Sequence, residues 1–125
     1  MKIKPGVEVH DLHPSLRDSL PFLEMSWKSF FPEDTDGALI TSGHEGSPTD
    51  EHRVHGPSSK HYKQNNADGL GHAIDLRVND VQQWKAAIWL GKAWELLNIN
   101  FPNHGWKLFP ENFLKESAHI HIQMD

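Results

Sequence analysis

The chain contains no cysteine, no long apolar run and no excess of basic residues. Without cysteine it can form neither a disulfide nor a thiolate metal site. Its 12 lysine and arginine residues stand against 17 aspartate and glutamate residues, and the net charge of −5 offers no electrostatic footprint for nucleic acid. No stretch approaches the roughly 20 apolar residues of a membrane-spanning helix. We therefore expect neither nucleic-acid binding nor membrane insertion.

The length of 125 residues fits a single domain, 1–125, that is large enough for one hydrophobic core. The sequence does not give the oligomeric state, for which a monomer is favoured. The opening residues, MKIKPGVEVH, lack the apolar core of a signal peptide. The expectation is therefore a protein that is cytoplasmic on synthesis, without an export route of its own.

Apolar residues at helical spacing predict two helices. Leu16, Leu23 and Trp27 share one face of a helix over residues 14–30, in which Pro21 predicts a kink or a restart.

The second helix is expected to begin at Asp80, a good N-cap residue, and to end near residue 98. Val81, Trp84 and Ile88 trace its apolar face, so its tryptophans are predicted to lie in the core.

Alternating residues predict short strands near 38–41, 73–78, 107–109 and 119–123. Between the first two strands, residues 43–60 are rich in glycine, proline and serine and are expected to form a long loop, which in a compact domain is usually functional. The element order favours an α+β fold, with helices packed on a small antiparallel sheet.

Three segments carry side chains that bind metals: HGPSSKHY at 55–62, GHAIDLRV at 71–78 and ESAHIHIQ at 116–123. In the last segment His119 and His121 alternate with isoleucines, so both imidazoles share one strand face. If the strand of Asp75 lies beside this tail, its carboxylate meets one of the two histidines, and His61 can complete a His–Asp–His set. Alternation alone does not choose between His119 and His121.

Three protein ligands around zinc leave a fourth position for a water molecule, and the metal lowers the pKa of that water to about 7. A carboxylate near the water can accept its proton. Glu116 is the best candidate for this base.

These segments resemble the motifs of the zinc D-alanyl-D-alanine carboxypeptidases and L-alanyl-D-glutamate endopeptidases, which cut peptidoglycan stem peptides, and those of the related hedgehog signalling domain. GVEVHDLHPSL at 6–16 and LITSGHEG at 39–46 are similar to the short phage-type members. The resemblance covers most of residues 6–123 and implies an α+β fold of the hedgehog and DD-peptidase kind.

The resemblance also implies roles for individual residues. Its metal would be Zn²⁺, with His61, Asp75 and His121 as ligands. Glu116 matches the catalytic base. His119 and His55 match histidines that flank the metal, and one of the two, with the zinc, would stabilise the developing oxyanion.

The sequence departs from the family pattern at two places. The link from His61 to Asp75 is lengthened to 13 residues by KQNNADGL at 63–70, a composition that predicts a mobile surface loop. His44 stands where many family members have an arginine, which leaves the oxyanion-stabilising group open.

The predicted function is a zinc-dependent peptidase acting on peptidoglycan stem peptides at the bacterial cell wall. It would be a phage lysis enzyme released to the wall by a separate membrane-permeabilising protein, or a wall-degrading protein carried in a virion. Two alternatives remain: a non-catalytic, zinc-stabilised binding domain of the same fold, and a metal-free polar patch of histidines.

Overall fold

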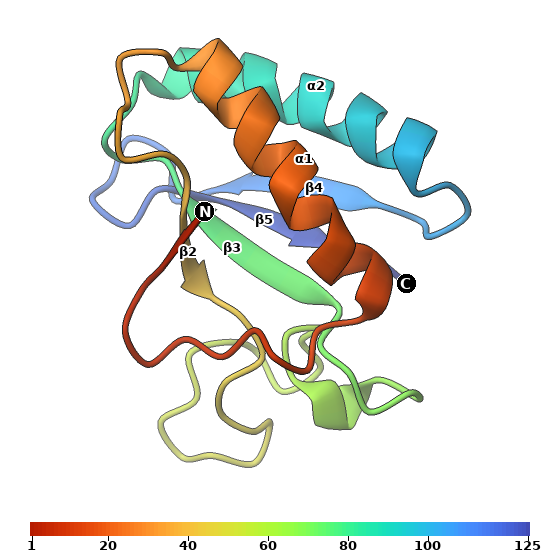
Figure 1. The fold of residues 1–125 in the computed structure, drawn as a ribbon. Helices are drawn as coiled ribbons and strands as arrows, with labels where there is room; N and C mark the ends of the chain where they lie inside the picture. Colours follow the sequence, from red (N-terminus) through yellow and green to blue (C-terminus); the bar gives the residue numbers. More distant parts are fainter.

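The computed structural model describes all residues from 1 to 125, and it has an α+β fold in which two helices cover one face of a five-stranded sheet (Figure 1). The helices are α1 (Pro14–Phe30) and α2 (Gln83–Asn100), with a one-turn 3₁₀ helix, η1 (Lys63–Asn65). The strands are β1 (Lys2–Ile3), β2 (Leu39–Ser42), β3 (Ala73–Arg77), β4 (Lys107–Glu111) and β5 (His119–Gln123). Neither helix is long and apolar enough to cross a membrane.

The sheet has the strand order β1-β2-β3-β5-β4. Neighbouring strands are antiparallel except for β1 and β2, which are parallel. The predicted α+β class is confirmed. The sheet is mixed rather than wholly antiparallel because β1, which no sequence pattern indicated, adds a short parallel edge.

Helix α1 has the predicted bounds and buries Leu16, Leu23 and Trp27, as the spacing predicted. The helix continues unbroken through Pro21, so the expected restart is wrong. Proline removes one backbone donor, and the carbonyl that loses its partner belongs to the exposed Arg17, where water can replace the missing bond.

Helix α2 differs from its prediction in start and orientation. It begins after Gln82, so Asp80 is not its N-cap residue. Trp84 and Ile88, expected in the core, are 62% and 51% exposed. The buried face is instead Ala86, Trp89, Ala93 and Leu97. Because apolar residues surround this helix, periodicity could not select the inner face, and the two alanines allow close packing there.

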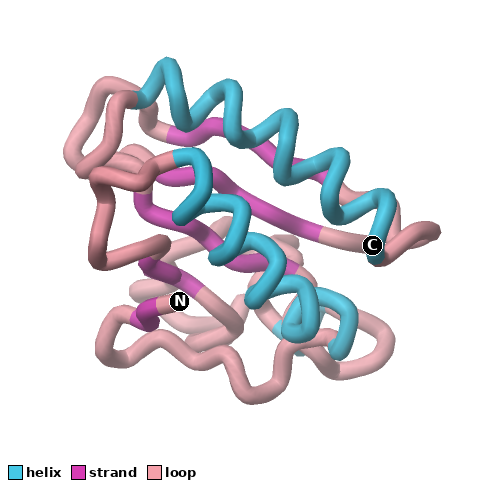
Figure 2. The backbone as a smooth tube through the Cα atoms, turned by 45° about the horizontal axis from the view of Figure 1, so that its top comes forward, coloured by secondary structure: helices cyan, strands magenta, loops and turns pink.

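The hydrophobic core lies between the helices and the sheet, where the rings of Trp27 and Trp89 meet edge to face at 5.0 Å. Figure 2 shows both helices on the same side of the strands. The opposite face of the sheet carries no helix, and the alternate side chains of β3 and β5 that are not in the core lie there. Asp75, His119 and His121 are on this open face.

Replacing Trp89 by alanine should lower the free energy of unfolding by about 3–5 kcal/mol, because the change removes a fully buried aromatic side chain. Trp84→Ala, on the same helix, is the matched control and should cost less than about 1 kcal/mol. Urea denaturation of the two variants measures both values. Similar losses in the two variants would contradict the observed orientation of α2.

Candidate metal centre

The pairing of β3 with β5 brings the predicted metal-binding residues together. Asp75 lies directly opposite His121 in the register, and both side chains are on the open face of the sheet. His61 reaches the same point from the loop before η1. The Asp75 Oδ1 atom is 3.2 Å from His61 Nε2 and 3.1 Å from His121 Nδ1, and the two imidazole nitrogens are 3.3 Å apart.

These distances fit one metal ion. Two ligands that each lie 2.0–2.1 Å from zinc at the tetrahedral angle are about 3.3 Å apart. The three atoms therefore already form one face of a tetrahedron of the size that zinc requires. The fourth corner is left to a group outside this set.

The tautomers of both histidines also suit a metal. His61 donates from Nδ1 to the Gly43 carbonyl at 2.8 Å, which leaves a lone pair on Nε2. His121 donates from Nε2 to Gln123 Oε1 at 2.8 Å, which leaves a lone pair on Nδ1. Such outer hydrogen bonds are the usual way in which a protein fixes the free nitrogen of a metal ligand.

Electrostatics couple Asp75 to its partners. Burial alone would raise the pKa of Asp75, but the hydrogen bond that His121 donates from Nδ1 outweighs it and holds this pKa well below its usual range. Burial alone would lower the pKa of His121, yet the hydrogen bonds with Asp75 and Gln123 and the nearby Glu111 raise it. The metal-free cluster thus favours an ionised Asp75 beside a protonated His121.

His55 lies flat against His61, with ring centroids 3.8 Å apart and planes at 3°. Its pKa falls to about 4, mainly through burial and then through the neighbouring His61, so the ring is neutral at pH 7. The proton position on His55 follows from Glu45, which shares Ser42 with it. Burial would raise the pKa of Glu45, but hydrogen bonds from Ser42 and from backbone amides lower it. Because an ionised Glu45 can only accept, Ser42 Oγ donates to it, at 2.7 Å. His55 Nε2 must then donate to the same Ser42 oxygen, at 2.7 Å.

His119 lies at the edge of the cluster. It donates from Nδ1 to the Ser117 carbonyl at 2.8 Å, and its Nε2 is 3.7 Å from Asp75 Oδ2. Its lone pair is therefore directed at the site, but from farther away than that of His121. Geometry thus gives a reason, which alternation could not, for ranking His121 before His119 as a ligand.

A carboxylate that the sequence patterns did not single out also reaches the centre. Glu111, at the end of β4, lies opposite His119 in the register, 3.6 Å from its Nε2 and 3.7 Å from His121 Nδ1. Glu116 is exposed, and its carboxylate makes no ion pair or hydrogen bond, although its carbonyl accepts from Asn79. Apart from the proposed ligand Asp75, the acid nearest to the histidine rings is thus Glu111 rather than the predicted Glu116.

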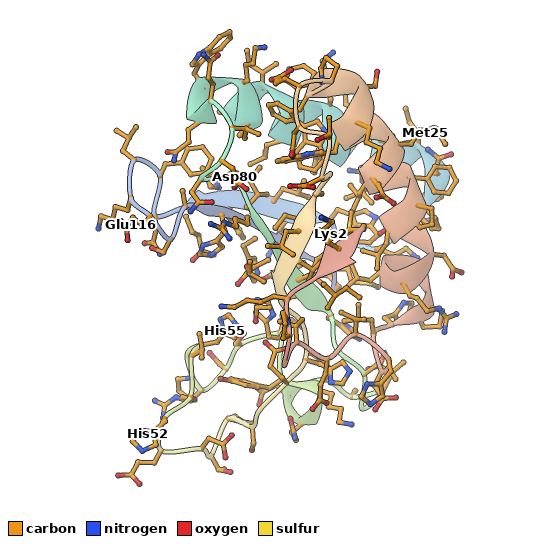
Figure 3. The ribbon with its side chains drawn as sticks, turned by 60° about the vertical axis from the view of Figure 1, so that its left-hand side comes forward. Lys2, Met25, His52, His55, Asp80 and Glu116 are labelled. Carbon is orange, nitrogen blue, oxygen red and sulfur yellow. The ribbon has the colours of Figure 1, made fainter.

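A cavity of about 530 Å³ adjoins the centre on the open face. Asp75, His55, His119, Glu111 and Glu116 are among the residues that line it. Figure 3 shows Glu116 and His55 on separate loops. All three residues predicted to take part in catalysis, Glu116, His119 and His55, therefore border one cavity.

Ligand atoms within 4.8 Å of one another occur in two overlapping groups at this centre, His55–His61–Asp75 and Asp75–Glu111–His121. The buried cluster could therefore hold a metal ion. A third group, Glu8–His10–His44, fits a metal poorly. There, His44 Nε2 accepts from the Asp11 backbone amide at 2.9 Å, so the proton of the neutral ring is on Nδ1, the nitrogen that faces Glu8. His44 is not among the ligand groups of the candidate centre.

The added segment 63–70 lies on the surface as predicted, but it is a folded turn rather than an open loop. It contains η1, and the buried Asn66 donates from its side-chain amide to the carbonyls of Lys60 and Leu70 at 3.0 and 2.7 Å. The extra residues therefore close on themselves and leave His61 at the centre.

No protein-family model, curated protein or solved structure matches this chain.

Replacing Asp75 by alanine should lower the zinc affinity by more than roughly 100-fold, since loss of an outer-shell partner alone costs 10- to 100-fold. Asp68→Ala is the matched control, because Asp68 pairs with His72 instead and lies outside the centre. Elemental analysis and calorimetric titration of zinc measure the effect. Retention of one tightly bound zinc by Asp75→Ala would contradict the ligand set.

The raised pKa of His121 predicts opposite pH effects on the metal-free and the zinc-bound protein. A protonated His121 stabilises the metal-free fold at low pH, and this contribution is lost as pH rises through its folded pKa, which lies above the ordinary 6.5. The lowered pKa of Asp75 keeps its own contribution constant above about pH 4. Zinc competes with the His121 proton, so zinc affinity should fall as pH is lowered from 8 to 6.

The measurement compares wild-type protein with His121→Gln at pH 6, 7 and 8, by thermal unfolding without metal and by zinc titration. The stability advantage of the wild type should shrink as pH rises. His13 and His44, whose pKa values are lowered without a contribution from His121, have a pH-dependent cost only below about pH 6.5 and cancel in this comparison. A constant difference between the two proteins would disprove the coupling.

Proposed function

We propose that the protein is a zinc-dependent peptidase that hydrolyses peptide bonds of peptidoglycan stem peptides. The observation that carries the proposal is the set of three ligand atoms, from His61, Asp75 and His121, at the spacing of a zinc site and next to a cavity. The motif resemblance supports stem peptides as the substrate class. The site would act at the bacterial cell wall, as a phage lysis enzyme or as part of a virion.

Zinc held by these residues would lower the pKa of a water molecule to about 7 and polarise a carbonyl group. The other roles belong to the chain. Glu111 is the proposed proton acceptor for the attacking water, because among the acids that are not proposed ligands its carboxylate lies nearest to the histidine rings. Glu116, the base implied by the motif resemblance, borders the same cavity and remains the alternative.

The two flanking histidines would act differently. Neutral His119 can only accept a hydrogen bond at Nε2, and it can donate from this nitrogen to a developing oxyanion once the ring is protonated. His55 uses its Nε2 proton for Ser42 and stacks on His61, so its proposed role is to position the His61 ring.

The test is digestion of purified peptidoglycan and of a defined stem peptide by the zinc-loaded protein, with fragments identified by mass. We expect cleavage that a chelator abolishes. Glu111→Gln should reduce the rate by roughly two to four orders of magnitude while zinc stays bound, because glutamine keeps the shape but cannot accept the proton. The exposed Glu95→Gln on α2 is the matched control and should leave the rate unchanged.

If Glu116→Gln shows this loss of rate and Glu111→Gln is fully active, the general base is Glu116. The absence of any cleavage by fully zinc-loaded wild type would contradict the peptidase proposal. That outcome would favour a zinc-stabilised binding domain, an alternative to which the exposed, unpaired carboxylate of Glu116 gives some support.

A further inference from the structure

The cavity beside the candidate metal centre has two cationic side chains in its wall, Lys4 and Arg77, and no other lysine or arginine. Arg77 is two residues from Asp75 on β3, so both side chains point to the open face, roughly 7 Å apart along the strand. Lys4 directly follows β1, where its backbone amide donates to the Ile40 carbonyl at 3.0 Å. Both cations therefore border the space that leads away from the metal centre.

Both cations keep N–H donors that no group of the chain accepts from. The Lys4 ammonium makes no ion pair and no hydrogen bond, unlike Lys2 on the same strand, which pairs with Asp36 at 3.1 Å. Arg77 uses only Nε, towards Asn79 and Asp80, and its two Nη groups have no partner. A guanidinium with its outer edge free is suited to a carboxylate, because two parallel N–H donors match the two oxygens.

Charge is unevenly distributed across this cavity. Arg77 and Glu111 lie on opposite sides of His119, each paired with it in the strand register. The cations belong to the β1 and β3 side of the sheet, and the carboxylates of Glu111 and Glu116 belong to the β4 and β5 side. A substrate with one negative group would therefore be held in one direction across the metal centre.

We propose that Lys4 and Arg77 form a subsite that binds a carboxylate of the substrate, one or two residues from the scissile bond. This deepens the proposed peptidase function and rests on it for the identity of the peptide. A stem peptide offers two such groups, the α-carboxylate of D-glutamate and the C-terminal carboxylate of D-alanine. The chemistry required of the ligand is the same in both cases.

The experiment uses three synthetic stem peptides: one with both carboxylates free, one with the D-glutamate carboxylate amidated and one with the C-terminal carboxylate amidated. Zinc-loaded wild type should lose roughly 10- to 100-fold in kcat/KM with one of the two amides, which is the usual worth of a hydrogen bond to a charged group. The amide that causes the loss identifies the carboxylate that the subsite binds.

In Arg77→Gln and Lys4→Met, the ratio of kcat/KM for the free peptide to kcat/KM for that amidated peptide should fall to about threefold or less. Lys2→Met and Arg17→Gln are the matched controls, because both residues are exposed, pair with other acids and lie outside the cavity. The controls should keep the wild-type ratio. An undiminished ratio in Arg77→Gln and Lys4→Met, or equal rates for all three peptides with wild type, would overturn the subsite.

Peptide affinity, measured by calorimetry on the same zinc-loaded proteins, separates this inference from the peptidase proposal. If wild type binds the free peptide at least tenfold more tightly than one amide but cleaves neither, the subsite stands and the peptidase proposal fails. If wild type cleaves all peptides and binds them equally, the peptidase proposal stands and the subsite fails.

Discussion

Asp75 is buried, with 5% of the residue exposed, and its carboxylate lies 3.1–3.2 Å from two imidazole nitrogens. A buried carboxylate costs several kcal/mol in lost hydration unless opposite charge and hydrogen bonds replace the water. His121 on the neighbouring strand supplies both, and His61, in the loop before η1, brings a second imidazole nitrogen to within 3.2 Å of the carboxylate. The position of this one carboxylate therefore links the sheet register, the long loop and the metal centre. A cation bound by His61, Asp75 and His121 would further offset the lost hydration of the carboxylate.

The sheet makes this arrangement possible because its two faces have separate tasks. On one face Ile74, Leu76, Ile120 and Ile122 pack in the core under α1 and α2. On the other face, the same alternation presents Asp75 beside His121. A shift of the register by one residue would put the isoleucines in water and the ligands in the core, so the burial of the apolar face also fixes the geometry of the site.

Local patterns were sufficient where a short segment determines the outcome. Alternation predicted that His119 and His121 share a face, and spacing predicted the bounds and buried side of α1. Long-range pairing was beyond reach: Glu111 meets the site only through the β4–β5 register, and Glu45 acts through Ser42 on His55. The inner face of α2 was mispredicted for a related reason, since apolar residues on all sides leave the choice to tertiary packing.

The central claim is that His61, Asp75 and His121 bind one metal ion together, and a crystal structure of the protein grown with zinc tests it most directly through anomalous scattering at the zinc edge. The account predicts a single strong peak about 2.0–2.1 Å from His61 Nε2 and His121 Nδ1, with Asp75 as the third protein ligand. A peak at Glu8, His10 and His44 instead, or no peak among the three predicted ligands at saturating zinc, would contradict it.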